Sequence, residues 1–407
     1  MKYIYIIGIV LLSFSILSCS NTPLSDEKVV QIPSEVIPEK TPEVSTIEVL
    51  NIDVKTATIN AKVINKGSAS VTKRGVCLNT IENPTIENGV LYPETITKAT
   101  GEFSANLFDL QDNTKYYIRA YAINKVGVGY GNQIVFDTKL ANIPVLKMGN
   151  VTISGVHDLF VDVKIVSNGD FPIVESGVTW DLNENPIIEN NKTTVRIKDN
   201  LGGFLQRITN LQELKKYFVR PYAKTIKGVT YGNQISVSTI KSGKFTFYMW
   251  EDPVASTETK AAYVRIRAAF EDATYYYNNF TSVEKHLTIN YSPGTPTADG
   301  NISGWINMGS NQSYQRTGTA MHEIAHTIGV GTHGQWGILM KGTWQGNRVK
   351  EILRVLTGST TSELLGDGQH FWPYGINGAN EDNGDEMLYI TNALILQGMK
   401  TDGLPSN

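Results

Sequence analysis

The sequence predicts a multidomain chain in which two all-β sandwiches precede an α+β domain. At 407 residues the chain is long enough for two to four domains. The first half repeats itself with a period of about 100 residues, and each repeat alternates apolar and polar side chains in short runs. Runs with helical spacing begin only after about residue 243. The segments that we expect are 1–18, 19–44, 45–139, 143–240 and 243–407.

The composition is ordinary for a protein that buries a core, with 41% hydrophobic and 9% aromatic residues. Its charge is nearly balanced, with 36 Lys+Arg against 39 Asp+Glu, so the basic footprint of a nucleic-acid-binding protein is missing. We expect no nucleic-acid partner and a monomer. Of the two cysteines, Cys19 and Cys77, the second falls in an expected strand as a small buried hydrophobe, and we expect no disulfide.

The chain begins with Met-Lys, and an apolar run from Ile4 to Leu17 follows. This run is too short for a spanning helix and is typical of the secretory signal expected over 1–18. Its ending at Cys19 resembles a bacterial lipobox. The resemblance implies that Cys19 is lipidated and anchors an exported protein to the outer membrane, at the cell surface or the periplasmic face; a plain signal peptide is the alternative. The polar, proline-containing segment 19–44 is expected to be a semi-extended tether.

The two repeats share several motifs. Tyr-Tyr-Ile-Arg-Ala-Tyr-Ala at 116–122 matches Tyr-Phe-Val-Arg-Pro-Tyr-Ala at 217–223, and Tyr-Gly-Asn-Gln recurs at 130–133 and 231–234. Alternation with a period of two, interrupted by turn residues, indicates antiparallel sandwiches. The pattern resembles the fibronectin type III-like modules common in secreted proteins of Bacteroidetes. We interpret the modules as spacers or adhesion units, with glycan binding through an exposed Trp180 as the alternative.

The sequence Met-His-Glu-Ile-Ala-His at 321–326 contains the H-E-x-x-H motif. On a helix, residues four apart lie on one face, so His322 and His326 would present two imidazoles to one ion. Imidazole suits zinc, which keeps a position open in catalytic sites. Glu323 would act there as the general base. Four of the 6 histidines fall between 322 and 370, which also favours a metal site.

The surroundings of the motif predict strand, helix, strand, strand and motif helix, over 244–250, 260–280, 287–291, 302–308 and 317–328. We expect 293–300 to be a loop, 302–308 to be an edge strand and the last helix to span 386–397. This order, together with His-Glu-Ile-Ala-His-Thr-Ile-Gly-Val-Gly-Thr-His, resembles the metzincin branch of the zincin metalloproteases. The resemblance implies a Zn²⁺ cofactor held by three side chains.

The third ligand is where the sequence departs from the metzincin pattern. Thr332 stands where the third histidine belongs, and His333 comes one residue late. His370 opens the block His-Phe-Trp-Pro-Tyr-Gly-Ile-Asn, which resembles a block found in secreted bacterial zincin-like proteins. We favour His370, with His333 as the alternative ligand. Glu351 would suit a gluzincin, but it lies off the apolar face of its expected helix.

Three further residues have possible roles near such a site. Tyr374 follows His370 by four residues and would donate a hydrogen bond to a developing oxyanion, with a packing tyrosine as the alternative. The resemblance also implies a methionine beneath the metal, for which Met340 and Met387 are both candidates.

These resemblances imply a secreted, lipid-anchored zinc metallopeptidase that hydrolyses extracellular or host proteins or glycoproteins. A different class of protein would carry the same modules and anchor: a surface adhesion or glycan-binding lipoprotein whose zincin-like domain is inactive. A zinc hydrolase acting on another bond is the third hypothesis. Glu323 favours the peptidase over the inactive adhesion lipoprotein, since a purely structural zinc site has no need of a base.

Overall fold

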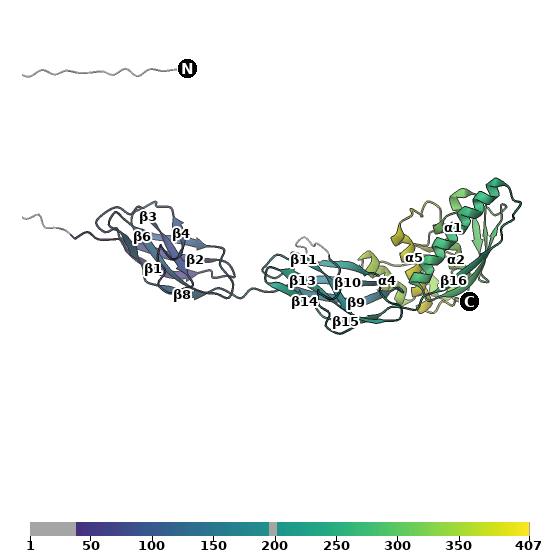
Figure 1. The fold of residues 1–407 in the computed structure, drawn as a ribbon, viewed down its shortest axis with the longest axis horizontal. Helices are drawn as coiled ribbons and strands as arrows, with labels where there is room; N and C mark the ends of the chain where they lie inside the picture. The colour runs from purple at the N-terminus through teal and green to yellow at the C-terminus, as the bar shows by residue number, and fades with distance from the viewer. Residues whose placement is uncertain (1–37, 195–201, 407) are drawn as a thin grey trace, which may run out of the picture. The chain divides into compact units, whose positions relative to one another are not determined.

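The computed structural model describes residues 38–194 and 202–406. The expected signal segment and the lipidation site at Cys19 lie outside these residues. The described chain forms two compact units, one built on the first repeat and one on the second repeat together with the C-terminal region. Figure 1 shows the strands of the repeats and the helices of the C-terminal region. No helix among the described residues is long and apolar enough to cross a membrane.

The first repeat is a β-sandwich. One sheet has the order β1-β2-β5, and the other has the order β4-β3-β6-β7 with β8 also paired to β6. Ile59, Ala61 and Val63 alternate toward the interior, as the period-two pattern predicts. Cys77 is buried, and its burial raises the thiol pKa to about 11, so it packs as a hydrophobe. The strands are β1 (Glu43–Leu50), β2 (Ala57–Asn65), β3 (Lys73–Asn79), β4 (Val90–Glu94), β5 (Gly101–Leu107), β6 (Lys115–Ile123), β7 (Val128–Tyr130) and β8 (Ile134–Asp137).

The second repeat also forms two sheets, in the orders β12-β10-β9 and β11-β13-β14, with β15 also paired to β13. Among the described residues it has no strand that corresponds to β4. Its core gathers Val161, Val163, Val178 and Val219. Trp180 packs half-buried against that core, as strand aromatics usually do. The strands are β9 (Val145–Ser154), β10 (Leu159–Ser167), β11 (Glu175–Asp181), β12 (Gly202–Ile208), β13 (Lys216–Thr225), β14 (Gly228–Tyr231) and β15 (Ile235–Ser238).

The tyrosine of the repeated Tyr-Gly-Asn-Gln motif makes the same hydrogen bond in both sandwiches. The hydroxyl of Tyr130 accepts a hydrogen bond from the backbone amide of Ile86 at 3.0 Å. The hydroxyl of Tyr231 accepts one from the amide of Ile188 at 3.1 Å. Each bond ties a long loop to the sheet, so the shared tyrosine is explained by the fold of the module alone.

The C-terminal region is built on a mixed sheet of order β16-β17-β19-β18. Strands β16, β17 and β19 are parallel, and the edge strand β18 runs antiparallel to β19. Helix α1 packs against α2 and β16 (Figure 1). The elements are β16 (Lys244–Met249), α1 (Thr257–Phe280), β17 (Glu284–Tyr291), β18 (Ala298–Gly300), β19 (Trp305–Met308), η1 (Gln312–Tyr314) and α2 (Thr317–Thr327).

The sequence prediction is wrong about the edge of this sheet. The segment expected to be an edge strand is β19, which lies between β17 and β18. The edge strand is β18, inside the stretch expected to be a loop. Three residues carry too little alternation to reveal a strand, and only pairing with β19 defines it.

The described residues after α2 form a small four-stranded sheet and three helices. Helix α4 packs on α5, and α5 also contacts α1 and α2. The last helix runs four residues beyond the expected end at Gln397. The elements are α3 (Trp336–Leu339), β20 (Met340–Lys341), β21 (Thr343–Trp344), α4 (Asn347–Thr357), β22 (Leu365–Gly366), β23 (Phe371–Trp372) and α5 (Glu386–Thr401).

The second sandwich and the C-terminal region share one hydrophobic core. Ile153 and Phe160 of the sandwich belong to the same buried cluster as the apolar face of α1. Arg348 of α4 donates a hydrogen bond to the carbonyl of Thr152 at 2.7 Å. The second sandwich is therefore a packing partner of the C-terminal region, whereas the sequence suggested a spacer.

The N-terminus of α2 is completed by a carboxylate from far along the chain. The residue before the helix, Arg316, provides no side-chain cap. Instead, Asp382 Oδ2 accepts hydrogen bonds from the Gly318 amide (2.9 Å) and Arg316 Nε (2.7 Å). The Tyr389 hydroxyl donates to the other oxygen at 2.6 Å. A buried carboxylate here satisfies an unpaired helix amide and interacts favourably with the helix dipole, so it fixes where α2 begins.

Replacing this carboxylate is expected to destabilise the C-terminal region. Asp382→Ala leaves a helix amide, a guanidinium and a buried hydroxyl without their shared acceptor, and we expect a loss of roughly 3 kcal/mol in the free energy of unfolding. Denaturant titration followed by tryptophan fluorescence measures it, because most of the tryptophans lie in this region. Glu363→Ala, at an exposed carboxylate, is the control. Equal midpoints for the two variants would contradict the assignment.

Candidate metal centre

Helix α2 carries three of the predicted residues on adjacent turns. Glu323 is only 5% exposed, and His322 and His326 are half-buried. The helix forms because its other face, with Ile324 and Ala325, packs into the core. It ends just before Gly329, whose φ of 107° is open to glycine and strained for other residues.

Two backbone carbonyls orient the two histidine rings. His322 Nδ1 lies 3.0 Å from the carbonyl oxygen of Gly375, and His326 Nδ1 lies 2.8 Å from that of Val330. A carbonyl oxygen only accepts hydrogen bonds, so each Nδ1 carries the proton and each Nε2 of a neutral ring presents a lone pair. This is the arrangement by which proteins orient metal-ligating imidazoles.

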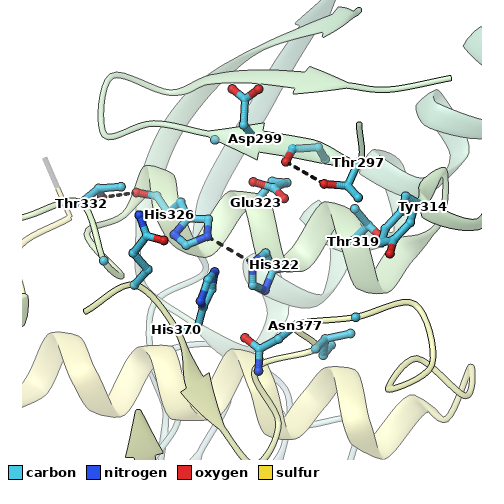
Figure 2. Close-up of a pocket in the computed structure, with 16 residues that line it drawn as sticks. Thr297, Asp299, Tyr314, Thr319, His322, Glu323, His326, Thr332, His370 and Asn377 are labelled. Carbon is cyan, nitrogen blue, oxygen red and sulfur yellow. Dashed lines mark hydrogen bonds between the residues drawn. The ribbon is translucent and has the colours of Figure 1, made fainter. Parts of the chain in front are cut away.

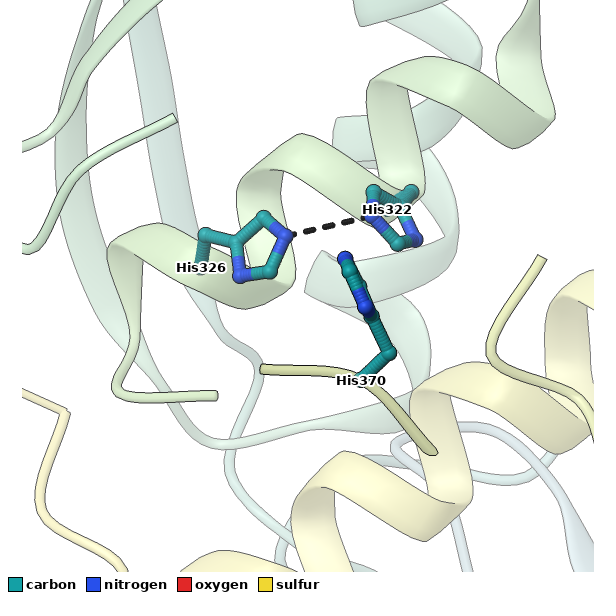
Figure 3. Close-up of side chains that lie close together, drawn as sticks. All are labelled: His322, His326 and His370. Carbon is teal, nitrogen blue, oxygen red and sulfur yellow. Dashed lines mark hydrogen bonds between the residues drawn. The ribbon is translucent and has the colours of Figure 1, made fainter. Parts of the chain in front are cut away.

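The two Nε2 atoms face one another at 3.1 Å, the contact drawn in Figure 3. Two lone pairs at that separation repel unless a cation lies between them. Zinc–nitrogen bonds of about 2.0–2.1 Å in a tetrahedral site place two ligand nitrogens roughly 3.3 Å apart. The spacing and the protonation of the rings therefore fit a zinc ion.

His370 comes to the same point from the loop before β23. One ring nitrogen from each of His322, His326 and His370 lies within 4.8 Å of the others (Figure 3). Asp367 shapes this loop, because its Oδ1 accepts from the backbone amides of Gln369 (2.8 Å) and His370 (2.7 Å). These bonds hold the pKa of Asp367 below its usual range.

The other two candidate ligands lie elsewhere. His333 Nδ1 accepts a hydrogen bond from the Gln335 amide at 3.0 Å, and the side chain borders a separate hollow beside Trp336. Glu351 pairs with Arg348 at 3.1 Å on an exposed part of α4. Thr332, at the position of the third metzincin ligand, donates instead to the carbonyl of His326 at 2.5 Å.

The electrostatics of the centre favour neutral groups. Burial, followed by the neighbouring His326, lowers the pKa of His322 to about 4, and burial also lowers that of His326. Burial, followed by the charge of Asp299, raises the pKa of Glu323 to about 8. A hydrogen bond from the Gly300 amide opposes that rise. Several groups with strongly shifted pKa values in one cavity are typical of functional sites.

The histidines and Glu323 open into a cavity of about 310 Å³ beneath the edge strand β18 (Figure 2). Gly300 of this strand lies against α2, where an added Cβ would come within 2.6 Å of the Glu323 carbonyl oxygen. A glycine at this position therefore allows the strand to approach the helix that carries the motif.

Tyr374 is not where the sequence suggested. Its side chain packs against the hydrophobic core, and it is absent from the cavity lining. The tyrosine that lines the cavity is Tyr314, from η1. Neither methionine candidate lines the cavity either: Met340 is buried near Gly366, and Met387 packs half-buried on the core.

A buried polar network that the sequence analysis missed supports the first histidine. Asn392 of α5 donates to the carbonyl of Tyr374 at 2.8 Å, one residue before the carbonyl that orients His322. Asn392 accepts in turn from the hydroxyl of Tyr277 at 2.9 Å, which also contacts the Met321 carbonyl at 2.9 Å. In the sequence, the sign of this network was Asn392, a polar side chain within the apolar run of the last helix.

No family model matches this chain, and no curated protein matches it. Among solved structures, the FN1–FN3 domains of chicken CNTN1 match at 14% identity over 50% of this chain and 69% of theirs, with a TM-score of 0.22. A myokine matches at 17% identity over 25% of this chain and 99% of its own, with a TM-score of 0.20. The sensor domain of the anti-sigma factor RsgI4 of Pseudobacteroides cellulosolvens matches at 16% identity over 25% of this chain and 97% of its own, also with a TM-score of 0.20. Likenesses this weak carry no argument about function.

The lowered pKa of His322 predicts how stability depends on pH in metal-free protein. The ring is protonated below about pH 6.5 in the unfolded chain and only near pH 4 in the fold. Its contribution is therefore present above pH 6.5 and is lost as the pH falls toward 4, by up to about 1.4 kcal/mol per pH unit.

This contribution is measured by urea titration of chelator-treated protein at several pH values between 4 and 7. The His322→Gln variant is expected to lose stability less steeply than wild type over this range, because glutamine does not titrate. Identical slopes for the two proteins would show that the His322 ring is protonated as easily in the fold as outside it.

Proposed function

We propose that this chain is a zinc-dependent peptidase of the zincin class, with His322, His326 and His370 as metal ligands and Glu323 as the general base. The observation that carries the proposal is the mutual orientation of the two α2 histidines, whose unprotonated nitrogens face one another at 3.1 Å with a third histidine beside them. A buried carboxyl on the same helix turn opens into the same cavity.

The residues of the centre suggest how it would cleave a peptide bond. The chemistry that a bound zinc ion supplies is Lewis acidity toward the substrate carbonyl. The charge of a bound zinc ion would offset the burial that raises the pKa of Glu323 and so favour its ionised form. The carboxylate would then accept a proton from a water molecule that attacks this carbon, forming the C–O bond. It then returns a proton to the nitrogen as the C–N bond breaks. The carbonyls of Gly375 and Val330 hold the histidine rings in place throughout, so the site needs little reorganisation.

The N-terminal pattern that ends at Cys19 supports export and lipid anchoring, which would place the peptidase at a bacterial membrane surface. Its substrate would then be a protein or glycoprotein outside the cytoplasm. The first sandwich would lie between anchor and catalytic unit along the chain, while the second packs on the catalytic region itself.

The identity of the third ligand is tested by metal content. We expect His370→Ala to lower zinc affinity by at least about 100-fold, because one of three nitrogens is removed. His333→Ala is the matched control and is expected to retain one zinc per chain. Elemental analysis of the purified, dialysed proteins gives the stoichiometry. Loss of zinc from the His333 variant alone would assign the third ligand to His333.

The role of Glu323 is tested by Glu323→Gln, which keeps the size of the side chain and removes the base. We expect zinc content to stay the same and casein cleavage to slow by roughly 100-fold or more. Glu363→Gln, at an exposed site, controls for the loss of one charge. A folded, zinc-loaded Glu323→Gln protein that is as active as wild type would contradict the role of Glu323 as general base. Inactivity of wild type itself toward every protein substrate would favour the adhesion hypothesis.

A further inference from the structure

The cavity has two chemically different ends. Figure 2 shows His326 and Thr332 at one end, and Thr319 and Tyr314 together at the other, beyond His322. Thr297, from the loop before β18, also lines the cavity. We call Thr297, Tyr314 and Thr319 the hydroxyl subsite. They come from the loop before β18, from η1 and from α2, and the tertiary structure brings Thr297 to the other two.

Thr319 gives the strongest indication that the hydroxyl subsite binds a ligand. It is 8% exposed, yet its hydroxyl makes no hydrogen bond to any residue that the structure describes. Its oxygen is not among the fully buried atoms that lack a partner, so it is open to the cavity that the residue lines. Thr274 and Thr327, in contrast, donate to carbonyls of their own helices at 2.7 and 2.8 Å.

The other two hydroxyls are also available. Tyr314 is half-buried, and its hydroxyl has no partner among the described residues. The hydroxyl of Thr297 makes only a long contact of 3.4 Å to the carbonyl of Ala298. A polar group held mostly out of water without a partner is costly, and a ligand that hydrogen-bonds to it removes that cost. The subsite therefore favours a ligand with a donor and an acceptor of its own.

Charge and size narrow the class of ligand. No lysine or arginine is among the side chains lining the cavity, so no charged side chain of the protein favours an anionic substrate side chain. The Asp299 carboxylate accepts from Asn307 at 3.0 Å and lies on the opposite side of the strand from Glu323 (Figure 2). The whole cavity, about 310 Å³, also has to hold the reacting peptide group, which leaves room for a short side chain.

We propose that the hydroxyl subsite selects substrates with a serine or threonine next to the cleaved bond, an inference that rests on the proposed peptidase function. The substrate hydroxyl donates to and accepts from the subsite hydroxyls. A valine of the same shape, or a leucine, leaves them unpaired. Sites built to hydrogen-bond a substrate hydroxyl discriminate against analogues that lack it, because the protein groups then lose their partner.

The test uses the zinc-loaded full chain and a set of peptides that differ only at the residue on either side of the cleaved bond, which is Thr, Ser, Val or Leu. We expect kcat/KM for the Thr peptide to exceed that for the isosteric Val peptide by roughly tenfold or more. Thr319→Val is expected to lower kcat/KM for the Thr peptide roughly tenfold and to leave the Val peptide nearly unchanged. Thr401→Val, on an exposed helix end, is the matched control.

The outcomes separate the two proposals. A wild-type protein that cleaves no peptide overturns the peptidase function. A wild-type protein that cleaves the Leu or Val peptide as well as the Thr peptide overturns the subsite and leaves the peptidase standing. If Thr319→Val does not fold, Tyr314→Phe removes another subsite hydroxyl from a half-buried position. An unchanged Thr-to-Val ratio in the folded variants then also overturns the subsite.

Discussion

The contact on which the candidate centre depends most is the one between His322 Nδ1 and the carbonyl of Gly375, 3.0 Å away. It fixes the tautomer of the ring and so turns the other nitrogen toward the cavity. It also joins α2 to the segment that follows His370, since Gly375 lies five residues after that histidine. The positions of two predicted ligands are thereby coupled through one hydrogen bond.

The groups around this contact are polar and buried, and almost every one is paired. Tyr277 and Asn392 are both fully buried and hydrogen-bond to each other and to the two segments that meet at the site. Asp382 plays the same part at the start of α2. Satisfied networks of this kind make a geometry rigid, because each lost partner leaves an expensive unpaired group behind. Thr319 is an exception, and its free hydroxyl faces the cavity.

The second sandwich belongs in this account although it carries no candidate ligand. Phe160 and Ile153 extend the core that supports α1, and α1 in turn packs on α2. Arg207 of the sandwich bridges Asp158 at 2.7 Å and Glu386, at the start of α5, at 3.1 Å. Elements that position the centre are thus held partly from outside the C-terminal region.

The sequence by itself determined what depends on short-range order. Period-two alternation and the recurrence of Tyr-Gly-Asn-Gln predicted the β-sandwiches, and the four-residue spacing of His322 and His326 placed both rings on one helix face. The tertiary structure decided the rest: that His370 and not His333 joins them, that Tyr314 and not Tyr374 lines the cavity, and that β18 forms the edge of the sheet. These depend on contacts between residues far apart in the chain, for which no local period exists.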